Sequence, residues 1–152
     1  MRLTITLMLL IALAGNSVLA CAALGGDEST IPKDASIGRM ELRAVAPGET
    51  RFRMHELRDA ARNLRVREYV NPDGKVFGVA WDGPTKPDLS QLLGPYFTRY
   101  MDAAAGHGMA RQLRRIDQPD FVLRVSGHMR HFTGSAWVPS LVPADVDPAE
   151  VK

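Results

Sequence analysis

The sequence has little of several features that would narrow its function. Only one of its 152 residues, Cys21, is a cysteine, which excludes an internal disulfide and a cysteine-based metal site. The formal net charge is only +2, so the chain lacks the strongly basic balance of a nucleic-acid-binding protein. It also contains no G-x-S-x-G elbow, P-loop, dinucleotide fingerprint or H-E-x-x-H segment. The chemistries that such motifs carry therefore have no support.

The sequence also lacks an apolar run long enough to cross a membrane. The uncharged stretch Leu3–Ala14 follows a basic Arg2 and ends at Gly15. A transmembrane helix needs about 20 apolar residues, whereas the core of a signal peptide needs about 7 to 15. We therefore predict that residues 1–22 are a signal peptide and that the protein is exported to the periplasm of a bacterial envelope.

Two processing routes fit the end of this leader. Ala20-Cys21-Ala22 has the A-x-A form, and we favour cleavage after Ala22. The alternative is a lipoprotein box, Val18–Cys21, with lipidation of Cys21 and with Gly25–Thr30 as the tether. Membrane attachment is expected only in the lipidated form. Neither route leaves a free thiol in the folded domain, so thiol catalysis is excluded, and with Arg2 removed the net charge falls from +2 to +1.

The rest of the chain predicts one small domain. Hydrophobic residues make up 45% and charged residues 24%, as in ordinary globular proteins. Residues 23–38 are polar and without apolar period, which predicts an irregular arm. Residues 39–143 are expected to form a single α+β domain, and the prolines of residues 144–152 predict an irregular tail.

Alternating apolar residues predict strands arranged as hairpins. One hairpin turns at 46–49, and a clearer one joins 64–70 to 75–81 through Asn71-Pro72-Asp73-Gly74, whose residues suit a tight turn. Its outgoing strand is expected to place Phe77, Val79 and Trp81 on one core face. A last pair is predicted at 121–125 and 129–138, with bends or bulges at its glycines.

One helix is predicted between the second and last hairpins. Asp88 is placed to cap its first turn. A single apolar stripe keeps helical phase through Gly94-Pro95, which predicts a kink with Pro95 on the wet side, and Gly106 ends the helix. The stripe consists of Leu89, Leu92, Leu93, Tyr96, Phe97, Tyr100 and Met101. The expected fold is thus an antiparallel sheet of hairpins with one kinked amphipathic helix packed on one face.

Several blocks of the sequence resemble a known bacterial family. They are Ala23–Gly26, Val66–Gly74, Val76–Pro84, Pro87–Leu89 with Leu92–Gly94, and Ser126–Arg130. Together they resemble the exported family catalogued as domain of unknown function 2844. The resemblance implies export and a single domain, and it brings no catalytic residues. Family members usually begin the mature chain at the Ala-Leu-Gly-Gly segment without a preceding cysteine, so Cys21 is a departure.

The histidines near residue 130 are the most suggestive candidates. His128 and His131 have an H-x-x-H spacing, but residues three apart on one strand point to opposite faces, so no metal site is expected. His128 and Arg130 follow Gly127 and are candidates for binding an anionic ligand at a bend. The alternative is that Arg130 only pairs with a carboxylate such as Glu68.

Arginines are concentrated between residues 39 and 67. Eight occur there against four acidic residues, which indicates a basic side of the sheet that suits an anionic lipid or polysaccharide. A merely solvated strand face is the alternative.

We therefore expect a non-catalytic module that binds an envelope protein or an anionic envelope component, without a cofactor and without nucleic acid. A small hydrolase or lyase with His128 as base and Arg130 as oxyanion partner, and a structural subunit, are the alternatives.

Overall fold

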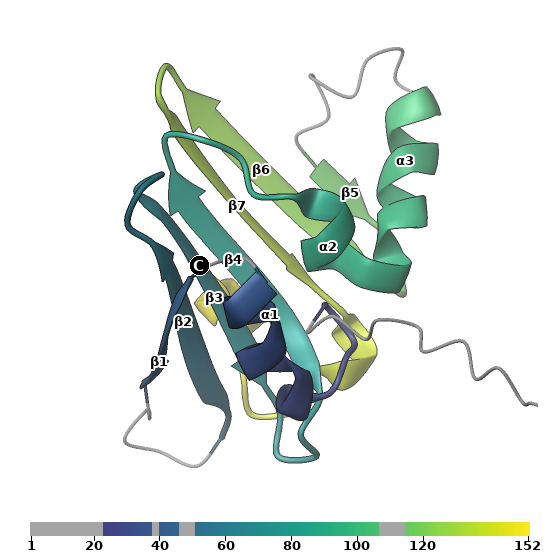
Figure 1. Cartoon of the computed structure of the whole chain (residues 1–152). Coiled ribbons are helices and arrows are strands. Elements are labelled where there is room, and N and C mark those ends of the chain that lie inside the picture. The colour runs from purple at the N-terminus through teal and green to yellow at the C-terminus, as the bar shows by residue number, and fades with distance from the viewer. Residues whose placement is uncertain (1–22, 38–39, 46–50, 107–114) are drawn as a thin grey trace, which may run out of the picture.

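The fold is a seven-stranded antiparallel sheet with helices on one face (Figure 1). The computed structural model describes residues 23–37, 40–45, 51–106 and 115–152. The α+β class is confirmed. The sheet order is β1-β2-β3-β4-β7-β6-β5, and the strands are β1 (Glu41–Val45), β2 (Arg53–Asp59), β3 (Leu64–Val70), β4 (Val76–Gly83), β5 (Arg115–Asp117), β6 (Val122–His128) and β7 (His131–Trp137).

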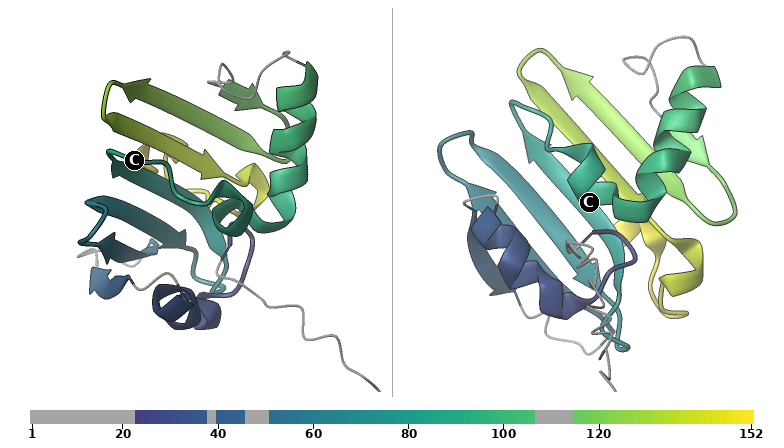
Figure 2. Two further views of the ribbon diagram at one scale, coloured as in Figure 1. Left: turned by 45° about the horizontal axis from the view of Figure 1, so that its top comes forward. Right: turned by 45° about the vertical axis from the view of Figure 1, so that its right-hand side comes forward.

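Two meanders build this sheet. β1 to β4 form the first and β5 to β7 the second, and β4 pairs with β7 to join them. The helices α1 (Ile31–Ile37), α2 (Leu89–Leu93) and α3 (Phe97–Gly106) lie on one side, which we call the helix face. Residues 139–152 lie against the other side, which we call the open face (Figure 2). The predicted hairpins are confirmed, although the turn at 46–49 lies outside the described residues.

The predicted kinked helix is present. Asp88 Oδ1 accepts hydrogen bonds from the backbone N–H groups of Ser90 and Gln91, at 2.9 and 3.3 Å. A 3-10 turn, Gly94–Tyr96, then joins α2 to α3, and Pro95 is exposed as predicted. The prediction that the last residue of the apolar stripe packs in the core is wrong, because Met101 is 48% exposed. The other six stripe residues pack in or against the core.

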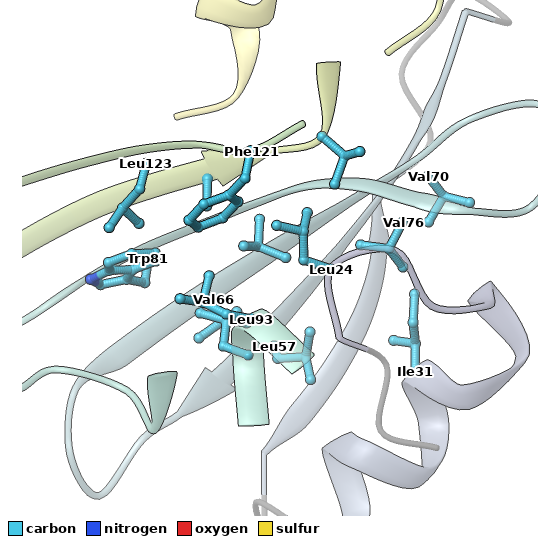
Figure 3. Packing of buried hydrophobic residues seen from close by; sticks show 14 of the residues in the cluster. Leu24, Ile31, Leu57, Val66, Val70, Val76, Trp81, Leu93, Phe121 and Leu123 are labelled. Atoms are coloured by element: carbon cyan, nitrogen blue, oxygen red, sulfur yellow. The ribbon is translucent and has the colours of Figure 1, made fainter. Parts of the chain in front are cut away.

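The main core lies between the helix face and the helices (Figure 3). Phe121 is fully buried and stacks on Tyr96 with ring centroids 5.6 Å apart. Trp81 lies over Gly134, where a Cβ would come within 2.1 Å of the indole ring. The predicted bulge at this glycine is absent from the continuous β6–β7 pairing. Gly134 instead gives the indole room.

A bulge does occur in the second hairpin and corrects one prediction. The pairing shifts between Tyr69 and Val70, so that Phe77 is the extra residue on β4. Phe77 therefore faces away from Val79 and Trp81, and it belongs to a second cluster on the open face. All three are buried, but they do not share a face. A one-residue irregularity reverses side-chain direction, because strand side chains alternate.

The prediction of an irregular arm at 23–38 is wrong. Leu24 and Ile31 are fully buried, and Ile31 begins α1. The segment before α1 adds main-chain bonds to the turn of the second hairpin: Gly25 N–H donates to Val76 O at 2.8 Å, and Glu28 N–H donates to Gly74 O at 2.9 Å. The segment is therefore ordered with few buried residues, because main-chain hydrogen bonds to the β3–β4 hairpin hold it in place. Residues 25–30 are part of the fold and do not form a tether.

The C-terminal segment, residues 139–152, contains only short helices and packs against the sheet. Its elements are two 3-10 helices, Pro139–Leu141 and Pro148–Glu150. Val146 and Val151 are buried in the open-face cluster with Tyr69, whose hydroxyl donates to Lys152 O at 2.7 Å. The tail thus closes one end of the open face.

Candidate functional site

Arginines collect on the uncovered part of the open face. Strand alternation and the pairing register place six of them there, on five strands. They are Arg43, Arg58, Arg65, Arg67, Arg115 and Arg124. The same face of the sheet carries four acidic residues, Glu41, Glu56, Asp82 and Asp117. The predicted basic side of the sheet is therefore present and extends beyond residue 67.

One buried glutamate organises the centre of this arginine group. Glu56 is 7% exposed. Its carboxylate lies 2.5 Å from Arg58 Nε, 3.6 Å from Arg65 Nε and 3.5 Å from Arg67 Nε. Burial raises the pKa of Glu56, but the hydrogen bond from Arg58 and the charges of Arg65 and Arg67 outweigh it and leave the pKa below its ordinary value. One negative charge thus holds three guanidinium groups in place, with two positive charges in excess.

A groove runs beside this cluster. Its volume is about 330 Å³, and Arg67 and Arg124 both line it. The remaining polar lining includes the carboxylate of Asp82, the hydroxyls of Ser126, Thr133 and Ser135, and Lys152. Within the described residues Arg124 has no carboxylate partner, and its guanidinium lies over the ring of Trp137 at 5.1 Å. Stacking on an aromatic ring orients a guanidinium without neutralising it.

The sequence candidates His128 and Arg130 lie at the tip of the β6–β7 hairpin. The chain reverses at Met129 and Arg130, not at Gly127, and Arg130 has a φ of 64°. His128, Arg130 and His131 are exposed, and none of them lines the groove. No observation therefore favours His128 as the base of a hydrolase or lyase.

Two expectations about these residues are wrong. His128 on β6 pairs with His131 on β7, so the two imidazoles share a face of the sheet. The expectation of opposite faces assumed that both histidines lie on one strand, whereas the turn of the hairpin lies between them. Arg130 also does not pair with Glu68. Glu68 is 2% exposed and faces the helix side at the middle of the sheet, in register with Val79 and Ala136. Ala136 is six residues from Arg130 along the strand.

Other arginines of the 39–67 group secure the fold. Arg53 donates to both oxygens of Glu28, at 2.9 and 2.7 Å, and His55 Nε2 lies 2.8 Å from Glu28 Oε1. The hydrogen bond from Arg53 is the main reason that the pKa of Glu28 falls to about 2. Arg51 donates to Asp145 O at 2.9 Å, and Arg62 lies 3.5 Å from Asp59. Arg39 lies outside the described residues.

No cluster of three metal-ligating side chains occurs in the described ranges. None of the helices described there is both long and apolar enough to span a membrane. Ala22 and Cys21, the two processing candidates, lie outside those ranges.

Comparison with known families gives one match. The model of a protein family of unknown function, DUF2844, matches residues 20–151. The chain belongs to this family. No curated protein and no solved structure matches it.

The groove of this DUF2844 chain could not be assembled from the sequence. Arg67 belongs to the first meander, whereas Arg124 and Ser135 belong to the second. Only the β4–β7 pairing brings the two meanders together. The one available signal was the alternation at 121–125, which exposes Arg124 on the face opposite Leu123.

Proposed function

We propose that this protein is an exported, non-catalytic envelope protein that binds an anionic polysaccharide through the open face. The observation that carries the proposal is a groove that is lined by Arg67, Arg124 and three hydroxyl side chains. Planar guanidinium groups donate paired hydrogen bonds to carboxylate or sulfate groups. The hydroxyls of Ser126, Thr133 and Ser135 suit sugar hydroxyl groups, which both donate and accept hydrogen bonds.

The arrangement around Glu56 supports the same ligand class. Arg58, Arg65 and Arg67 share one carboxylate, so their positive charge is only partly neutralised. The cluster continues the groove along β2 and β3, which suits an extended polymer better than a single small anion. Because these side chains are surface groups, their attraction falls off within a Debye length of about 8 Å at physiological salt.

Export is part of the proposal, and two features support it. Residues 1–22 have the basic start and the apolar core of a leader, and Leu24, which follows closely, is fully buried in the folded domain. The family match also covers residues 20–151 and leaves out most of the leader. Intact-mass analysis of the protein from the native envelope tests the route. We expect an N-terminus at Ala23; an acylated Cys21 would replace this route with anchoring, and an uncut Met1 would contradict export.

Binding to a soluble polyanion tests the ligand class. We expect the mature protein to bind alginate at low salt, to lose affinity as salt rises, and to ignore uncharged dextran. Arg67→Ser/Arg124→Ser should weaken alginate binding about tenfold, with an unchanged thermal midpoint. The matched control is Arg62→Ser/Arg99→Ser, which removes the same charge from arginines that do not line the groove. Equal losses in the two double variants would contradict a specific groove.

A further inference from the structure

Two exposed histidines lie side by side at the tip of the β6–β7 hairpin. His128 is the last residue of β6 and His131 is the first of β7, and the pairing register places them directly opposite each other. Only the turn residues Met129 and Arg130 separate them in the chain. The tip lies away from the three helices (Figure 1), so the fold leaves both imidazoles accessible.

Directly opposed positions of an antiparallel pair suit two ligands of one metal ion. Their Cβ atoms are about 4.5–5.5 Å apart, and both side chains are on the same face of the sheet. A metal ion at about 2.0–2.1 Å from each imidazole nitrogen requires the two nitrogens to be no more than about 4 Å apart. Two imidazole rings that start from neighbouring Cβ atoms can reach this separation by changing rotamer.

Neither imidazole is engaged elsewhere in the part of the chain that the structure describes. His128 and His131 make no hydrogen bond or ion pair there. His55 differs, because its Nε2 lies 2.8 Å from Glu28 Oε1 and its side chain is only 16% exposed. The nitrogens of the two tip histidines are therefore available to a ligand, whereas His55 holds the N-terminal segment on the sheet.

The donor atoms determine which class of ion suits the pair. Imidazole nitrogens bind copper, nickel and zinc, whereas calcium and magnesium prefer oxygen ligands. Among the described residues no third His, Cys, Asp or Glu joins the two histidines, so water must complete the coordination. A structural zinc site needs four protein ligands. Cu²⁺ binds a given nitrogen site more tightly than the other divalent ions of its series, so it is the ion that two imidazoles hold best.

We propose that His128 and His131 together bind one Cu²⁺ ion, with one imidazole nitrogen from each strand and water at the remaining positions. The strand pairing holds both ligands in register before the ion arrives, so little conformational entropy is lost on binding. The positive charge of Arg130, in the turn, opposes a cation, but its side chain is exposed and solvent screens the repulsion. The site goes beyond the proposed polysaccharide binding and does not depend on it.

Calorimetric titration of the mature protein with copper(II) chloride tests the site, at about pH 7.5, where free imidazole is neutral. We expect one tightly bound Cu²⁺ per chain, binding of Zn²⁺ that is weaker by about tenfold or more, and no binding of Ca²⁺. In proton NMR spectra, substoichiometric Cu²⁺ should broaden the imidazole signals of His128 and His131 before that of His55. No binding of Cu²⁺, equally tight binding of Zn²⁺, or earlier broadening of His55 would each overturn the proposal.

Variants of the hairpin separate chelation by the pair from binding by a single histidine. His128→Ala and His131→Ala should each weaken Cu²⁺ binding by about tenfold or more, because the second ligand acts at a high effective concentration. Their thermal midpoints should not change, because both side chains are exposed. The matched control is His128→Ser/Ser126→His, which keeps the composition and moves one imidazole to the position opposite Thr133.

The affinity of this exchanged variant for Cu²⁺ should fall to within about threefold of that of the single variants, because diagonal neighbours are about 7–8 Å apart. Wild-type affinity in either single variant or in the exchanged variant would contradict chelation by His128 and His131.

Discussion

The two faces of the sheet are covered in different ways. Three helices cover the helix face, and their packing encloses most of the core, including Phe121 and Trp81. On the open face, the described residues cover one end, where turns of the C-terminal segment bury Phe77 and Val151. The rest of that face carries arginines and hydroxyl side chains. Stability is therefore concentrated on one side of the sheet and accessible charge on the other.

Strand alternation explains how one sheet can carry an apolar face and a charged face. Apolar residues alternate with arginines along β3, so that Leu64 and Val66 face the helices while Arg65 and Arg67 face outward. Because the core side supplies most of the buried apolar area, the outer side can carry like charges that contribute little to stability. Two hollows follow from this division: a groove lined by arginines and hydroxyl side chains outside, and an apolar pocket with a buried acid inside.

The largest expected effect compares the two clusters directly. Phe121→Ala should lower the free energy of unfolding by about 3–5 kcal/mol, because it leaves a cavity among helices and strands that cannot close. Phe77→Ala removes a ring of the same size, but the C-terminal turns can move into the space. We expect its cost to be smaller by about 1 kcal/mol. Urea denaturation measures both, and a larger loss for Phe77→Ala would reverse the assignment of the main core.

Gly134 provides a test of packing within the helix face. Gly134→Ala places a methyl group 2.1 Å from the Trp81 ring and should cost about 2 kcal/mol through overpacking. Ser135→Ala is the neighbouring control, since its side chain faces the open side, and it should cost less than about 0.5 kcal/mol. Thermal unfolding distinguishes the two. Equal stability of the variants would show that the indole moves freely.

The contact of Glu28 with Arg53 and His55 fixes the N-terminal segment on β2 and should depend on pH. The pKa of Glu28 is lowered from 4.5 to about 2 in the folded state, so the stabilisation is fully present above pH 4.5 and is lost as the pH falls through 2. Because Arg53 is half exposed, solvent screening reduces the effect, and Glu28→Gln should cost about 1–2 kcal/mol at pH 7.

The same comparison at pH 2 should show little difference between Glu28→Gln and wild type. The control is Asp27→Asn, which removes an exposed ion pair with Lys75 at 2.8 Å and should cost less than about 0.5 kcal/mol at either pH. A loss for Glu28→Gln that stays constant from pH 7 to pH 2 would contradict an ionic origin.

The smallest expected effect on stability occurs on the open face. Glu56→Gln should lower the free energy of unfolding by about 1 kcal/mol or less, because its arginine partners reach solvent. The change should also strengthen alginate binding about threefold, since it leaves the three arginines without their shared negative charge. Asp120→Asn, which breaks the 2.7 Å pair with Arg99, makes the same change in net charge elsewhere. Stronger binding in both variants would indicate a general charge effect.

The predictions from the sequence succeeded where short-range patterns decide the structure. The turn at 71–74, the cap at Asp88 and the kink at Pro95 each depend on a few neighbouring residues. The predictions failed where contacts with a distant segment of the chain decide the structure. The irregular arm was wrong, because residues 25–28 are ordered by main-chain bonds to the β3–β4 turn. Phe77 was assigned to the helix face, because the alternation of residues along β4 does not indicate the bulge.

The candidate sites show the same limit. The excess of arginines before residue 67 predicted a basic sheet side, but the sequence singled out His128 and Arg130, which lie at an exposed hairpin tip. The buried acid Glu68 was noticed only as a partner for Arg130. Its place in the pocket depends on α2 packing across β3, a contact between segments separated along the chain.

By itself, the sequence determined the strands other than β5, the kinked helix, the α+β class and the family, because alternation, capping and turn chemistry act over a few residues. Tertiary structure alone decided which arginines meet, where Glu68 is buried and how the N-terminal segment is ordered. The physical reason is that these features depend on the β4–β7 pairing and on helix packing, which join residues far apart in the chain.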